Sequence, residues 1–218
     1  MGYCENNNSN SNSEIVQSAT KSKKMSNESS FILKPTKKSG NYSILRQCTR
    51  NGKSETMRIK YNIYGVYLPF GSEEYNENTI INAQIDDSTN LNHNLIITLN
   101  KICDAFKKLG ETETGRNKYG LNDKIFFPFL KPKDEDKKEE KKEEKREIDG
   151  KEINKYQARF YLKYGAKINH AKLVGEMSPS QLKGKLCNLD IEMGSMWVNE
   201  KLSQYGVNVY VTHITVLN

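Results

Sequence analysis

The chain has 218 residues, of which 35% are hydrophobic and 28% charged, and a net charge of +7. This suits one folded domain of about 150 residues with polar tails. No window approaches the roughly 18 consecutive apolar residues of a membrane span, and the start, MGYCENNNSNSNSE, lacks the basic and apolar segments of a secretory signal. We therefore expect an intracellular protein without a membrane partner.

The cysteines indicate neither a metal site nor a disulfide scaffold. They stand far apart, with no C-x-x-C pair and no histidine at ligand spacing. Their positions are Cys4, Cys48, Cys103 and Cys187. We expect reduced thiols and no cofactor.

The positive charge is concentrated near the two ends of the chain. Residues 1–58 carry a net charge of +6 and residues 153–218 a net charge of +4, whereas residues 59–120 and 121–152 carry −2 and −1. A surplus localised in this way favours a polyanionic partner such as nucleic acid.

Residues 1–40 are predicted to be a disordered polar tail. The runs NNNSNSNS and SATKSKKMSNESS have no periodic apolar face whose burial would offset the entropy of ordering. The folded domain is therefore predicted to span residues 41–218.

A β-hairpin is predicted to open the domain. Tyr42–Cys48 (YSILRQC) is a short strand, Asn51-Gly52 is a dipeptide favoured in type I′ turns, and Glu55–Leu68 alternates as the return strand. Gly65 is expected to form a bulge or a sharp bend that shifts the register. Four residues share the polar face of the return strand: Arg58, Lys60, Asn62 and Tyr64.

One amphipathic helix is predicted over residues 90–109, after a strand at Thr79–Ile85. Its apolar residues follow helical spacing from Leu91 to Leu109, residues 86–89 supply acidic and hydroxyl groups for its start, and Gly110 is expected to end it. Such a stripe faces a core, so the helix should cap a sheet.

A long charged loop is predicted inside the domain. Lys124–Leu130 (KIFFPFL) is expected to be a strand with Pro128 at an edge or bulge. The following residues 131–152, KPKDEDKKEEKKEEKREIDGKE, have nearly cancelling charges and lie between two predicted strands.

The strand Lys155–Tyr164 (KYQARFYLKY) alternates so that one face is apolar while Arg159, Tyr161 and Lys163 lie on the other. Aromatic planes stack bases and flanking cations follow a phosphate backbone, so this second face predicts a platform for single-stranded nucleic acid. An ordinary solvated strand face is the alternative.

No catalytic motif is present. The histidines His93, His170 and His213 have no acidic or cysteine partner at a recognisable spacing, and no P-loop, G-x-S-x-G or G-x-G-x-x-G occurs. Only Asp190 and Glu192 approach the paired carboxylates of a two-metal nuclease. We predict that the protein is not an enzyme.

The closing segment, Leu189–Leu217, contains an aromatic strand (Met196-Trp197-Val198), a polar turn and an aromatic-glycine pair (Tyr205-Gly206) before a terminal β-branched strand. It resembles the OB-fold single-stranded DNA-binding proteins of nucleocytoplasmic large DNA viruses, a group related to the podophage single-stranded DNA-binding proteins. The resemblance implies sequence-independent binding of single-stranded DNA in viral DNA replication, recombination or repair, in the host cytoplasm, at a viral replication site or in the nucleus. The podophage proteins end in an acidic tail that recruits replication partners, and this sequence, ending at 216–218, is not expected to recruit partners in that way.

We therefore predict a mainly β fold with one main helix: an OB-like Greek-key barrel over residues 41–218, capped by the helix and interrupted by the loop at 131–152. No catalytic or metal-binding residue is assigned. The predicted nucleic-acid contacts, some of which are alternatively core aromatics, are Arg58, Lys60, Tyr64, Arg159, Tyr161, Lys163, Trp197 and Tyr210.

Single-stranded DNA is the expected partner, with RNA as an alternative ligand. Replication proteins and a second copy of the chain are candidate protein partners. The competing hypothesis is a structural or adaptor protein, for example a virion component, in which the same β-domain contacts another protein.

Overall fold

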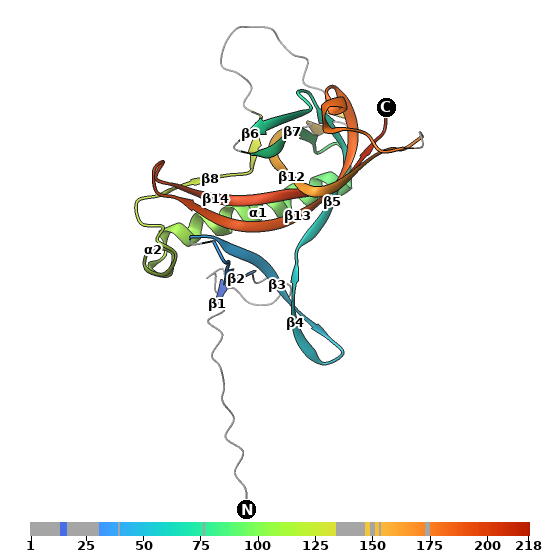
Figure 1. Ribbon diagram of the computed structural model, residues 1–218. Helices are drawn as coiled ribbons and strands as arrows, with labels where there is room; N and C mark the ends of the chain where they lie inside the picture. Colours follow the sequence, from blue (N-terminus) through green and yellow to red (C-terminus); the bar gives the residue numbers. More distant parts are fainter. Residues whose placement is uncertain are drawn as a thin grey trace, which may run out of the picture.

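The computed structural model describes residues 14–16, 31–38, 40–75, 77–133, 147–148, 151–152, 154–172 and 175–218 (Figure 1). Strands dominate these ranges, and two α-helices accompany them. In the part of the chain described here, neither helix has both the length and the apolar character needed to cross a bilayer.

Five strands form the body of the domain. They are β5 (Lys60–Leu68), β7 (Asn78–Asp86), β12 (Lys155–His170), β13 (Lys185–Asn199) and β14 (Gln204–Val216). The hydrogen-bonded order is β5–β7–β12–β14–β13 and back to β5, so the sheet closes on itself. β12 and β14 are parallel, the other neighbours are antiparallel, and β5 meets β7 only at Tyr67 and Gln84. This is a partly open, five-stranded Greek-key barrel, which confirms the predicted OB-like fold.

The sheet continues beyond β13 through β3 (Tyr42–Arg50), which pairs with β4 (Lys53–Arg58). Asn51 and Gly52 connect these two strands with φ of 51° and 74°, as a type I′ turn requires, so the predicted hairpin is confirmed. Figure 1 shows the hairpin reaching away from the barrel, and every residue of β4 is exposed.

The predicted return strand is two strands, because the chain bends at Ile59. The Ile59 side chain is buried and its carbonyl accepts the N–H of Met193 at 2.9 Å, so the chain here leaves β3 and joins β13. Gly65 has φ of 63°, and the β5–β13 register shifts beside it, as the predicted bulge requires.

The ordered sheet begins earlier than residue 41, so the predicted tail boundary is wrong. β2 (Phe31–Pro35) pairs with β3, and its Phe31, Ile32 and Leu33 side chains are buried. The Phe31 ring centre lies 6.3 Å from that of Phe106 on the helix that follows β7, and Phe31 and Leu33 belong to the hydrophobic core. A short β1 (Glu14–Val16) pairs with β2, and residues 1–13, 17–30 and 39 of the predicted tail lie outside the described residues.

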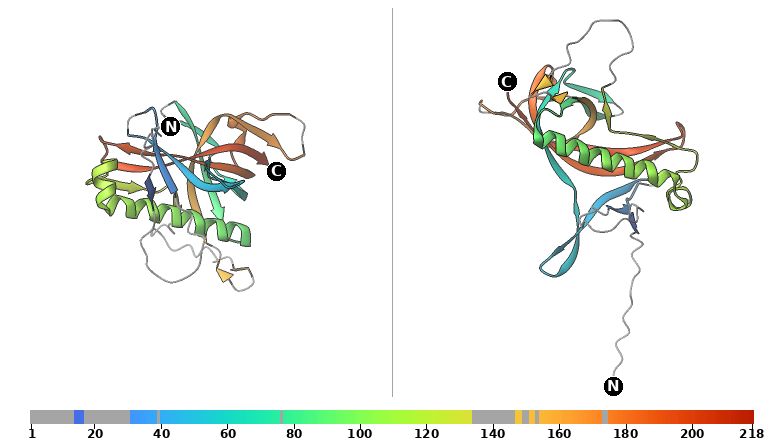
Figure 2. Two further views of the ribbon diagram at one scale, coloured as in Figure 1. Left: turned by 90° about the horizontal axis from the view of Figure 1, so that it is seen from below. Right: turned by 180° about the vertical axis from the view of Figure 1, so that it is seen from behind.

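Helix α1 (Asn90–Glu111) covers one side of the barrel (Figure 2, right). Thr89 caps it by accepting the N–H of Asn92 at 3.1 Å, as the residues before the helix predict. The predicted apolar stripe is buried from Leu95 to Leu109, and its first member, Leu91, is exposed. The helix runs two residues past its predicted end, so Gly110 lies inside it.

Polar contacts fix both ends of α1 to the barrel. At its start, the buried Asn92 amide donates to the carbonyl of Tyr64 at 2.8 Å and accepts the Tyr64 N–H at 3.3 Å. At its end, the Tyr205 hydroxyl donates to the carbonyls of Phe106 (3.0 Å) and Lys107 (3.2 Å). Burial raises the pKa of Tyr205 to about 12, so this hydroxyl remains a neutral donor at physiological pH.

The segment after α1 differs from the sequence prediction. A second helix, α2 (Glu113–Tyr119), was not predicted, and its Tyr119 ring meets that of Tyr42 edge-on at 4.8 Å. The strand predicted over Lys124–Leu130 is divided at Pro128, which lacks an N–H for a ladder. Its halves are β8 (Ile125–Phe127), which pairs with β14, and β9 (Leu130–Pro132), which pairs with β12.

The remaining elements are short. Because β9 includes residues 131 and 132, the charged loop begins after Pro132 and not at residue 131 as predicted. Residues 134–146 of that loop lie outside the described part of the chain. The short elements are β6 (Ser72–Tyr75), β10 (Glu147–Ile148), β11 (Lys151–Glu152) and a 3₁₀ turn at Pro179–Leu182.

Replacing Gly110 tests the docking of α1. In a helix interior, glycine to alanine ordinarily stabilises by about 1 kcal/mol. Here a Cβ at Gly110 would overlap the Tyr205 hydroxyl. We expect Gly110→Ala to lower the free energy of unfolding, by about 1–3 kcal/mol as for other overpacked sites, in urea denaturation. The loss should shrink in a Tyr205→Phe background, and stabilisation by Gly110→Ala alone would contradict the contact.

Candidate nucleic-acid interface

The predicted polar face of β12 lies on the outside of the barrel. Phe160 is fully buried, whereas its neighbours Arg159 and Tyr161 are partly exposed and Lys163 is exposed. Tyr161 is opposite Ile80 on β7 and Tyr210 on β14. The alternating face therefore runs from the β7 side of the barrel to the β14 side.

Two tyrosines from neighbouring strands form an aromatic pair at the centre of this face. The ring centroids of Tyr161 and Tyr210 are 6.1 Å apart and the planes are inclined by 51°. Burial raises the pKa of Tyr161, more strongly than the nearby Arg159 cation lowers it. The Arg159 guanidinium lies 4.7 Å from the ring centre of Tyr75 on β6. The pair is thus a neutral aromatic surface with a cation beside it.

Three of the predicted cations converge on one buried carboxylate, that of Glu192. Lys163 Nζ lies 3.1 Å and Arg58 Nε 3.3 Å from Glu192 Oε1, and Lys60 Nζ lies 3.9 Å from Oε2. The Glu192 side chain is 5% exposed, and those of the cations are 46–69% exposed. The cationic ends therefore face solvent above the acid, and we call these four residues the Glu192 cluster.

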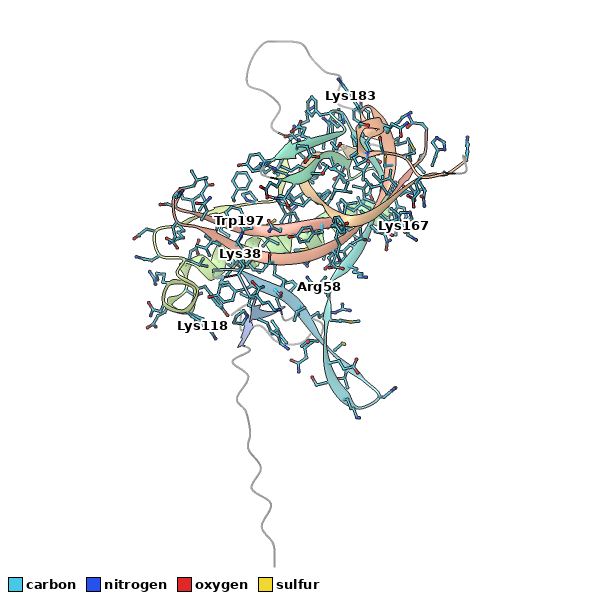
Figure 3. The ribbon with its side chains drawn as sticks, in the orientation of Figure 1. Lys38, Arg58, Lys118, Lys167, Lys183 and Trp197 are labelled. Carbon is cyan, nitrogen blue, oxygen red and sulfur yellow. The ribbon has the colours of Figure 1, made fainter. Side chains whose placement is uncertain are left out.

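Two glycines let aromatic rings lie close against the sheet. A Cβ at Gly194 would overlap the ring of Tyr210, and a Cβ at Gly206 would come within 2.7 Å of the Trp197 ring. Each ring thus crosses a glycine on the paired strand, and both aromatic residues remain partly exposed. In Figure 3 Trp197 is labelled beside the β13–β14 ribbon, and Arg58 is labelled below it, where β4 meets β5.

A groove of about 220 Å³ adjoins the β12 face on the β7 side. Its lining includes the polar residues Asn82, Gln84 and Gln157, together with Arg159. Phe70, from the loop after β5, and Phe127 also line it, and Lys131 Nζ lies 4.6 Å from the Phe127 ring centre. In OB-folds the face of the second and third barrel strands, here β7 and β12, is where oligonucleotides bind.

A second polar network lies beside the Glu192 cluster. Asp190 accepts a hydrogen bond from the Asn62 amide at 2.6 Å and lies 3.4 Å from His213 Nδ1. His213 Nε2 is 3.3 Å from the amide of Asn169. None of the three cluster cations forms an ion pair with Asp190 in the described ranges, and within those ranges no group of three or more His, Cys, Asp and Glu side chains could hold a metal ion.

The structure brings most of the predicted contact residues onto one outer face. Tyr64 does not join them. Its backbone is hydrogen-bonded to Asn92 of α1, and its ring takes part in none of the ring contacts found in the described residues. The residues that share the face are Arg58, Lys60, Arg159, Tyr161, Lys163, Trp197 and Tyr210.

Several residues of this surface were not predicted. Glu192 was considered only as half of a metal-binding pair, and its partners come from three other strands. Phe70, for which no prediction was made, and Phe127, from the predicted strand Lys124–Leu130, both line the groove. Gly194, which makes room for the ring of Tyr210, has no local signal in the sequence.

No protein-family model and no curated protein matches this sequence. Among solved structures, the single-stranded DNA-binding protein gp2.5 of bacteriophage T7 is similar, with 8% identity, a TM-score of 0.43, and coverage of 73% of this chain and 91% of that one. A C-terminally truncated single-stranded DNA-binding protein from bacteriophage Enc34 has 16% identity, a TM-score of 0.41, and coverage of 85% and 95%. At these TM-scores neither match assigns a function to this chain.

The ring of Trp197 offers a test of the aromatic arrangement, because it is the only tryptophan. A Cβ at Gly206 would lie 2.7 Å from the Trp197 ring and 2.8 Å from the backbone carbonyl oxygen of Phe127. Because that oxygen belongs to the backbone and yields less easily than a side chain, the Trp197 ring must move in Gly206→Ala. We expect its fluorescence emission to shift to longer wavelength, with a loss of about 1–3 kcal/mol in stability.

The control for this experiment is Gly194→Ala, which displaces Tyr210 instead. It should destabilise the fold similarly and leave the tryptophan emission unchanged. A shift of equal size in both variants would show that the emission reports general loosening.

Proposed function

We propose that this protein binds single-stranded DNA without sequence preference, along the outer face of β12, β14 and β13 and the adjoining groove. The observation that carries the proposal is the Tyr161–Tyr210 pair, which lies between Arg159 on one side and the Glu192 cluster on the other. Neutral aromatic rings flanked by cations match the alternation of bases and phosphates along an unpaired strand.

The shape of the groove favours an unpaired strand over a duplex. Its lining combines aromatic residues with amide residues, and this composition suits an unstacked base, since an amide can both donate to and accept from a base edge. A duplex keeps its bases stacked and offers mainly phosphates to such a surface. Residues of β7 and β12 line this groove, and these strands correspond to the second and third barrel strands whose face OB-folds use for oligonucleotides, which supports the proposal.

Support of viral DNA replication, recombination or repair, at the viral replication site, is the biological role we propose. It rests on the resemblance of the closing segment to the proteins of large DNA viruses, to which Trp197 and the Tyr205-Gly206 pair contribute. The sequence contains no recognised catalytic motif, and we propose a non-enzymatic protein.

The phosphate contribution is tested with Arg159→Ala and Lys163→Ala. Each variant should bind labelled oligo-dT more weakly and flatten the dependence of log affinity on log salt by about 0.7 for each phosphate that the variant no longer neutralises. Lys101→Ala is the matched control, because it removes one exposed cation from α1. Its affinity and salt slope should equal those of the unchanged protein.

The stacking contribution is tested with Tyr161→Ala. We expect a loss of about 1–3 kcal/mol in the binding of oligo-dT with an almost unchanged salt slope, because stacking releases no counterions. Tyr161→Phe keeps the ring and should bind nearly as well. If the unchanged protein shows no oligo-dT binding at low salt, or if the triple change Arg159→Ala, Tyr161→Ala, Lys163→Ala folds and still binds, this face is not the site; the first outcome favours the adaptor hypothesis. A preference for oligo-U over oligo-dT would make RNA the ligand.

A further inference from the structure

Glu192 is a buried acid in the middle of the surface proposed to bind a polyanion. It projects outward from β13, between Lys60 on β5 and Tyr210 on β14 in the strand ladders. An acid at this place requires explanation, because a carboxylate repels the phosphates that the neighbouring cations attract.

Burial of this carboxylate is made tolerable by its three cations. Removing a carboxylate from water costs several kcal/mol unless it is paired and hydrogen-bonded, and Lys163 and Arg58 both approach Oε1. The cations benefit in return, since three positive charges gathered without an anion would repel one another. The cluster has three cations and one acid, so its net charge is +2.

The outer side of each cation remains available for a ligand. A lysine has three N–H donors on its one nitrogen, and an arginine has five. Each cation makes one described contact with Glu192, so N–H groups of each cation remain for another acceptor. A carboxylate and a phosphate are both oxyanions that accept charge-assisted hydrogen bonds from these groups. The same three side chains can therefore be shared between the acid beneath them and a phosphate above them.

We infer that Glu192 is an internal competitor for phosphate: it holds Arg58, Lys60 and Lys163 in place and lowers their affinity for the backbone of the bound strand. This inference rests on the proposed function. Glu192 is thus a positioning residue that exchanges binding strength for an ordered, ready-formed cation cluster.

The proposal predicts opposite changes in affinity and stability for Glu192→Gln. The amide has the shape of the acid and its oxygen can still accept from Lys163, whereas the net charge of the cluster rises to +3. Affinity for oligo-dT at low salt should increase at least about fivefold, and the increase should diminish as salt screens the added charge. The unfolding midpoint should fall, because three cations lose their counter-charge. A purely structural role would weaken binding as stability falls.

Asp190→Asn is the matched control. Asp190 lies two residues away on the same strand and is bonded to Asn62 and His213 instead of the cluster cations. It removes the same charge from a more exposed position, so affinity should change by less than about twofold. An equal gain in both variants would overturn the inference, because net charge alone would then explain it. Unchanged or weaker binding by folded Glu192→Gln would overturn it as well.

A second background protects the test against misfolding of Glu192→Gln. Lys60→Met removes the most distant cation of the cluster, so the double variant Lys60→Met, Glu192→Gln has fewer repelling charges to accommodate. The double variant should bind oligo-dT more tightly than Lys60→Met alone, and equal or weaker binding would contradict the inference.

Binding by the unchanged protein separates the two proposals. If it binds oligo-dT and Glu192→Gln gains nothing, the competitor role fails and the proposed function stands. If it binds no oligo-dT, the proposed function fails. The cluster is then tested with inorganic phosphate, which must raise the unfolding midpoint of Glu192→Gln more than that of the unchanged protein for the competitor role to survive.

Discussion

The pairing of β13 with its neighbours is the constraint on which the rest of the structure depends. β13 is bound along its length to β14, while its other edge is bound first to β5 and then to β3. The register shift between Met193 and Met196 lies where β5 gives way to β3. Glu192, the last residue paired with β5, is thereby set between Lys60 and Tyr210. Neighbouring strands are about 4.8 Å apart, so the cation cluster and the aromatic pair must adjoin.

The parts of the fold that were predictable are those determined by local sequence. The type I′ turn at Asn51-Gly52, the bulge at Gly65 and the amphipathic stripe of α1 each depend on residues within a few positions of one another. The parts that were missed depend on distant contacts. Gly110 lies within the helix, close against Tyr205, and Phe31–Leu33 is ordered because α1 and β3 lie beside it.

The candidate site shows the same division. Strand alternation placed Arg159, Tyr161 and Lys163 on one face, since a period of two needs no tertiary information. Alternation also placed Arg58 and Lys60 together, and it could not show that Glu192, more than a hundred residues later, would bind both. Alternation also could not show that the backbone of Tyr64 binds α1, because this helix begins 26 residues later in the chain. Pairings between strands, and the partners of helix ends, require the register that only the folded chain supplies.

The exposure of the β3–β4 hairpin has a dynamic consequence. Because no residue of β4 is buried, this ribbon has no core of its own, and its hydrogen bonds should open locally at a free energy well below that of global unfolding. Its amide protons should therefore exchange with solvent long before those of β13 and β14. Arg58, the last residue of β4, forms an ion pair with Glu192 at the base of the hairpin. The orientation of the hairpin is therefore coupled to the cation cluster. A bound nucleic-acid strand whose phosphate attracts Arg58 would weaken the Arg58–Glu192 ion pair. The rate of amide-proton exchange in the hairpin would then report whether the cation cluster on the barrel is occupied.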